Sequence, residues 1–101
     1  MIIKFGTLDE VKLLPKNLSS DVIDEISRCI NILNDAYGAE RNYYTVGGYV
    51  IYAETNDDLK ELGDIFSNKT NEWELLTESH ILRLYLLGDD FSVVLCTPKN
   101  I

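Results

Sequence analysis

The end of the chain constrains the fold most, because residues 81–87 and 91–96 are two apolar runs separated by the turn sequence Gly-Asp-Asp. This pattern predicts a β-hairpin. A loop with an even number of residues would place the apolar side chains of both runs on one face, whereas a three-residue loop would change the pairing. The expected buried face consists of Leu82, Leu84, Leu86, Phe91, Val93 and Leu95.

The opposite face of this hairpin would be more apolar than a solvent-facing sheet requires. It would carry Ile81, Tyr85, Leu87, Val94 and Cys96 beside Arg83 and Ser92. We therefore expect another surface to cover it, and a homodimer is the simplest cover. Arg83 would then need an acid of the neighbouring chain, because an unpaired buried charge is costly. The predicted dimer interface consists of Ile81, Arg83, Tyr85, Leu87 and Val94.

Two segments have the apolar spacing of amphipathic helices. The first begins at a cap formed by Ser19 or Ser20 and ends at Gly38. Its apolar stripe consists of Val22, Ile23, Ile26, Cys29, Ile30, Leu33 and Tyr37. The second begins at Thr55, which resembles an N-cap, and ends near Asn68. Its stripe consists of Leu59, Leu62, Ile65 and Phe66.

The remaining segments add short strands. Residues 2–5 and 73–76 are strand candidates, and residues 7–18 predict a loop with a turn that ends at Pro15. Residues 43–46 and 49–53 are rich in aromatic and β-branched side chains and flank Gly47-Gly48. These two runs form either a hairpin with a Gly-Gly turn, which we favour, or one long strand with a bulge at the glycines.

This order of elements predicts a single α+β domain over residues 1–101. We expect a two-layer sandwich in which two helices pack on one face of a mostly antiparallel sheet of four to five strands. The order of the strands stays open, because the strands that flank each helix could still be parallel. A chain of 101 residues buries roughly two-thirds of its unfolded surface, so it needs no disulfide or metal to fold.

Charge excludes some partners and favours others. The net charge is −8, and residues 54–101 alone contribute −6 of it. Such a balance repels phosphate backbones and anionic membrane surfaces, so we expect no direct nucleic-acid or membrane binding. No apolar run reaches the roughly 20 residues that span a bilayer, and the first residues do not resemble a signal peptide, so we expect a cytoplasmic protein. A basic protein is the kind of partner that this charge favours.

No catalytic, metal or cofactor motif is found in the sequence. Cys29 and Cys96 are too far apart for a CxxC motif, and His80 is the only histidine. We expect both cysteines to be free, buried and apolar in role. The Gly47-Gly48 pair lacks the sequence context of a phosphate-binding loop. The chain is therefore expected to be non-catalytic, without a metal or cofactor.

Two sets of residues are candidates for partner binding. Tyrosine is favoured at interfaces because it buries a large area at a low entropic cost, although strands also favour it. Acids at the start and on the outer side of the second helix would present negative charge. The predicted partner-binding residues are Tyr43, Tyr44, Tyr49, Tyr52, Asp57, Asp58, Glu61 and Asp64. They favour a non-catalytic interaction, inhibitor or regulatory domain that binds another protein.

A second hypothesis belongs to a different functional class. A small enzyme or ligand-binding domain could build a pocket from polar residues that are scattered along the chain. The residues that would serve this purpose are Tyr52, Glu54, His80 and Arg83. A stable protein partner would support the first hypothesis, and a bound metabolite would support the second.

Overall fold

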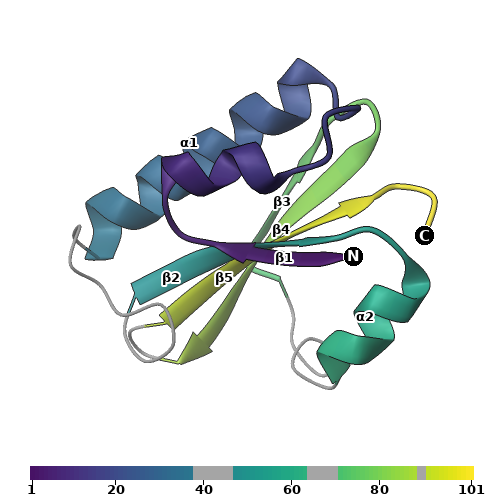
Figure 1. The fold of residues 1–101 in the computed structure, drawn as a ribbon. Coiled ribbons are helices and arrows are strands. Elements are labelled where there is room, and N and C mark those ends of the chain that lie inside the picture. The colour runs from purple at the N-terminus through teal and green to yellow at the C-terminus, as the bar shows by residue number, and fades with distance from the viewer. Residues whose placement is uncertain (38–46, 64–70, 89–90) are drawn as a thin grey trace.

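The computed structural model describes residues 1–37, 47–63, 71–88 and 91–101, and Figure 1 shows the arrangement of its elements. The expected α+β class is confirmed: five strands form one open, mostly antiparallel sheet with helices packed against it. In chain order the elements are β1 (Ile2–Phe5), the 3-10 helix η1 (Leu8–Leu13), α1 (Ser20–Tyr37), β2 (Gly47–Ala53), α2 (Asn56–Leu62), β3 (Trp73–Leu76), β4 (His80–Gly88) and β5 (Phe91–Pro98).

The strand order in the sheet is β1-β2-β5-β4-β3. Among the described strands, only β2 and β5 are parallel, whereas β1 pairs with β2, β4 with β5, and β3 with β4 in antiparallel fashion. The carboxyl ends of β2 and β5 therefore lie at the same end of the sheet, beside the amino end of β4. Side chains from three separate parts of the sequence can meet there.

The predicted facing of the closing hairpin is wrong, and a β-bulge is the reason. Gly88 pairs with Phe91, as a two-residue loop requires, but the register shifts by one residue between Leu86 and Gly88. Beyond the shift, Leu84 pairs with Val94. A shift of one residue moves every following side chain to the other face. The predicted partners Val93 and Leu95 therefore lie on the face opposite Leu84.

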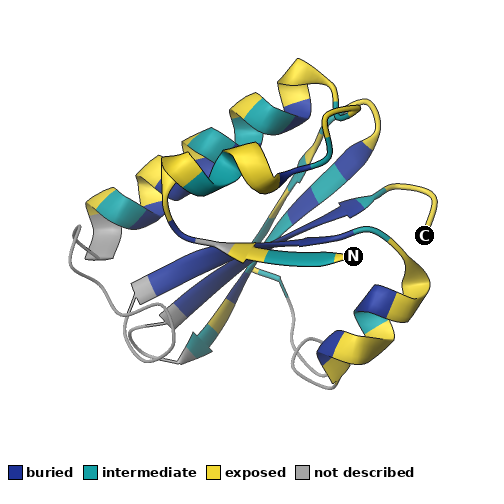
Figure 2. Cartoon of the chain, in the orientation of Figure 1, coloured by how far each residue is buried: buried dark blue, intermediate teal, exposed yellow. Residues whose placement is uncertain are grey.

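Helix α1 covers one face of the sheet at β2 and β5 (Figure 1). The helix begins where expected, since the backbone N–H of Ile23 donates to the Ser19 carbonyl. Its buried side chains pack against Val50, Tyr52 and Val94 in the main core. The α1 residues in this core are Val22, Ile26, Cys29, Ile30 and Leu33. Figure 2 shows that this side of α1 and the centre of the sheet are buried.

Helix α2 packs against the other face, whereas the sequence predicted both helices on one face. Its Leu59 and Leu62 contact a second core cluster that includes Tyr49, Ile51 and Val93. Odd-numbered and even-numbered residues of a strand point to opposite faces, so β2 offers apolar side chains on both faces of the sheet. Each helix can therefore pack on a face of its own. The short α2 ends at Gly63, whose φ of 68° is a conformation that favours glycine.

Gly48 allows β2 to pack closely against both β5 and α1. A Cβ atom at this position would lie 2.6 Å from the Ser92 carbonyl oxygen and 2.8 Å from Leu33 Cδ2. Both distances are shorter than a normal contact, so a side chain would force the layers apart. The alternatives of a Gly-Gly hairpin or a bulged strand depend on residues 43–46, which lie outside the described residues.

Candidate functional site

The acidic face predicted on α2 is only partly available to a partner. Asp58 is 7% exposed, and its carboxylate accepts hydrogen bonds from the α-amino group of Met1 and from the backbone N–H groups of Glu54 and Thr55. These bonds hold the pKa of Asp58 down at about 2. Asp58 therefore stabilises the start of α2. Asp57 and Glu61 are exposed, whereas Asp64 lies outside the described residues.

The predicted tyrosine surface is not formed by the tyrosines that the structure describes. Tyr49 is 8% exposed and Tyr52 is 2% exposed, and they belong to core clusters on opposite faces of the sheet. Burial raises the pKa of Tyr52 to about 12. Neither ring offers a broad surface to another protein. Tyr43 and Tyr44 lie outside the described residues.

The predicted dimer interface is also changed by the structure. Because of the bulge, Val94 lies in the core beneath α1 and is 1% exposed, so its assignment to the opposite face is wrong. Tyr85 lies on the expected face of the sheet, but it is only 7% exposed and belongs to the second core cluster. Arg83 Nε donates to Glu74 Oε2 of the neighbouring strand at 2.9 Å. Ile81 and Leu87 are half-buried.

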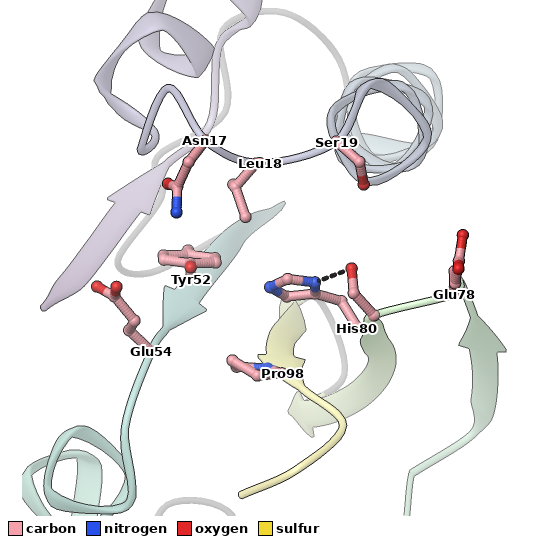
Figure 3. Close-up of a pocket in the computed structure, with 9 residues that line it drawn as sticks. Asn17, Leu18, Ser19, Tyr52, Glu54, Glu78, His80 and Pro98 are labelled. Carbon is pink, nitrogen blue, oxygen red and sulfur yellow. Dashed lines mark hydrogen bonds between the residues drawn. The ribbon is translucent and has the colours of Figure 1, made fainter.

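A cavity of about 630 Å³ with a mixed polar and apolar lining lies at the end of the sheet where β2 and β5 finish and β4 begins (Figure 3). We call it the His80 cavity. The segment before α1 and the turn before β4 complete its walls. Its nine lining residues are Asn17, Leu18, Ser19, Tyr52, Glu54, Glu78, Ser79, His80 and Pro98. Two of them carry a carboxylate, and none is a lysine or an arginine.

His80 is held in this cavity by the turn between β3 and β4. Its backbone N–H donates to Thr77 Oγ1 at 2.9 Å, and its carbonyl accepts from the Thr77 N–H at 2.9 Å. The Ser79 hydroxyl forms a hydrogen bond with Nδ1 at 2.7 Å, whereas the buried Nε2 has no hydrogen-bond partner among the described residues. Burial lowers the pKa of His80 below 6.5, and the negative charge of Asp21 opposes this shift only in part.

The His80 cavity brings together three of the four residues named for a pocket from sequence. Tyr52 and His80 face each other with ring centroids 6.1 Å apart, and Glu54 lies beside them. Arg83 does not join them, because it points to the other face and pairs with Glu74. Sequence reasoning missed Glu78 and Asn17, whose positions in loops gave no signal of the site.

A second, apolar cavity of about 250 Å³ lies between α1 and the β3–β4 side of the sheet. We call it the apolar groove. It is lined by Cys29, Ile32, Leu33, Trp73, Leu84, Leu86, Ser92 and Val94. Ile32 and Leu86 at its rim are 51% and 48% exposed, whereas Trp73 and Leu84 are half-buried. Helix α1 thus leaves part of this sheet face uncovered.

The two cysteines are buried and free, as expected. Cys29 and Cys96 belong to the main core cluster and are 3% and 0% exposed. Burial raises the thiol pKa of Cys29 to about 11 and that of Cys96 to about 12. Thiols with such pKa values are protonated at neutral pH and are poor nucleophiles.

Within the described part of the chain, no three acidic, histidine or cysteine side chains are grouped as metal ligands would be. In the same residues, no helix is long and apolar enough to cross a membrane. Comparisons with protein-family models, with curated protein sequences and with solved structures found no match.

Proposed function

We propose that this chain is a non-catalytic, regulatory protein-binding domain, and that it docks a basic amphipathic helix of another protein in the apolar groove. The observation that carries the proposal is the uncovered apolar surface beside α1, where Ile32 and Leu86 are about half exposed above a cavity of about 250 Å³. For comparison, an apolar cavity of about 150 Å³ can bind benzene. The groove can therefore accept one large apolar side chain.

A helix is the occupant that fits this position. One face of a sheet is normally covered by a layer of helices, and α1 fills only part of that layer. A second helix beside α1 would complete it by laying an apolar stripe over Leu84 and Trp73. The partner would thereby replace part of a layer that this chain does not supply from its described elements.

The polar face of the docked helix is expected to be basic. In the sequence, Asp35 follows Ile32 by three residues on α1 and Glu72 precedes Trp73, whereas Glu25 and Arg28 form an ion pair with each other. The chain as a whole carries a net charge of −8. Opposite charges around an apolar contact raise the association rate and exclude acidic competitors.

The experiment uses a synthetic amphipathic helix of leucine and lysine, with a leucine–glutamate helix of the same pattern as control. Trp73 is the only tryptophan and lines the groove, so its fluorescence reports binding directly. We expect the basic helix alone to shift the emission. Leu86→Glu should weaken binding about tenfold or more, which corresponds to about 1.4 kcal/mol.

Leu76→Glu is the matched control, because Leu76 is 60% exposed and lies on the opposite face. It makes the same chemical change without touching the groove. Equal weakening by both variants would mean that the loss does not arise in the groove, because an added carboxylate by itself strengthens the attraction of a basic peptide. A failure of the basic helix to change Trp73 emission at any concentration would contradict the proposed docking.

The homodimer predicted from sequence stays a second proposal. The face opposite α1 still offers Ile81, Leu87 and the exposed Leu76, although Val94 and Tyr85 are no longer available. This face does not overlap the apolar groove, so the two interactions can be tested with separate variants.

A further inference from the structure

The His80 cavity has features of a ligand site that is separate from the apolar groove. It is about 630 Å³ in volume, which is within the usual range of small-molecule pockets. It is built at the carboxyl ends of the parallel strands β2 and β5, the end of a parallel sheet where ligands commonly bind. The groove lies elsewhere and shares no lining residue with it.

The charges in the cavity select the ligand class. Glu54 and Glu78 line it, and the nearby Asp21 adds a third negative charge that acts on His80. Lys16 and Lys99 are next in sequence to lining residues, but both are exposed and neither lines the cavity. Carboxylates without a lining cation repel anions and favour an ammonium or guanidinium group.

His80 is the second, independent sign of a ligand. The residue is 7% exposed, and its Nδ1 is hydrogen-bonded to Ser79. Figure 3 shows the imidazole between Leu18, Tyr52 and Pro98, with the other ring nitrogen toward Tyr52. Nε2 is buried without a partner among the described residues. Buried polar atoms are almost always hydrogen-bonded, and exceptions often mark a functional position.

We propose that the His80 cavity binds a linear aliphatic diamine. Figure 3 shows Glu54 and Glu78 on opposite sides of the imidazole, so two cationic ends can each meet a carboxylate. The middle of the cavity offers Leu18, Pro98 and the Tyr52 ring to a methylene chain. The ring centroids of His80 and Tyr52 are 6.1 Å apart, so a ligand that contacts Tyr52 changes the surroundings of the imidazole.

The test records the imidazole NMR signals of His80, which is the only histidine in the chain. The probes are diaminobutane, butylamine with one charge, and butanediol with none. We expect diaminobutane to shift the His80 signals in a saturable way, butylamine to bind more weakly, and butanediol to have no effect. Equal effects of diaminobutane and butanediol would overturn the proposal.

Variants test where the charges of the ligand lie. Glu54→Gln and Glu78→Gln should each weaken diaminobutane binding by roughly fivefold, the upper value for one solvent-exposed ion pair. Glu61→Gln removes the same charge from an exposed position on α2 and should leave binding unchanged. Equal weakening by all three variants would mean that the diamine follows net charge and would overturn the site. Trp73 fluorescence should stay constant throughout, since the groove is not involved.

Discussion

At the residue scale, the chemical types of the side chains are enough to predict part of the His80 cavity from the sequence. Tyr52, Glu54 and His80, which the sequence offers as polar groups able to serve a pocket, line one cavity. Their meeting requires β2 to lie beside β5 and β5 beside β4. Alternation within a strand does not encode that order, although it does place Arg83, three residues after His80 in β4, on the other face.

His80 gives the first prediction at this scale. Burial lowers its pKa in the folded state below 6.5, the ordinary value that the unfolded chain retains. As pH falls through 6.5, the unfolded state therefore takes up a proton first, and the free energy of unfolding decreases. The decrease stops below the folded-state pKa, where both states are protonated. An NMR titration of the imidazole should have its midpoint below 6.5.

Urea unfolding over the same pH interval provides the matching stability measurement. His80→Gln has no group that titrates there and should remove this part of the pH dependence. A titration midpoint at or above 6.5 would show that the charge of Asp21 outweighs burial.

At the scale of elements, the periodicity of apolar residues predicts whether a segment is a helix or a strand better than it predicts which face of the sheet its side chains occupy. Helix α1 covers Ser20–Tyr37, as its spacing of apolar residues indicated. Strand β4 was also expected, yet the bulge after Leu86 exchanged the faces of β5. One extra residue in a ladder leaves no mark in the alternation of either strand. The facing of Val94 could therefore not be predicted from sequence.

Gly48→Ala tests how tightly the elements are packed. The added methyl group would meet the Ser92 carbonyl oxygen and Leu33 Cδ2 at 2.6 and 2.8 Å. We expect the variant to lose about 1–3 kcal/mol of stability, the usual cost of overpacking. Urea denaturation measures this loss. An unchanged midpoint would mean that β2 can move away from β5 without cost.

The double variant Leu33→Ala, Gly48→Ala separates the two contacts. Because Leu33→Ala removes the side-chain contact and keeps the backbone contact, the two losses should add to more than the loss in the double variant. Simple additivity would show that the clash with Ser92 alone determines the cost.

At the scale of the whole molecule, charge and shape have opposite effects on association. The net charge of −8 opposes contact between two copies, yet the face opposite α1 keeps an apolar rim. Leu76 is 60% exposed there and pairs in register with Ile81. At such an interface Arg83 needs an acid as its partner. Glu74 of the same chain supplies it, so burial at an interface would leave no unpaired charge.

We therefore expect the chain to form a homodimer through this face at micromolar concentration, as measured by sedimentation velocity. Leu76→Glu should yield a folded monomer, whereas Leu86→Glu, on the other face, should leave the dimer intact. Added salt should strengthen the dimer, because repulsion between like charges is screened beyond about 8 Å at physiological ionic strength. The same salt should weaken the binding of the basic helix to the apolar groove, because its attraction to the acids at the rim of the groove is electrostatic. A monomer at all concentrations and salt levels would leave this face without a role in self-association.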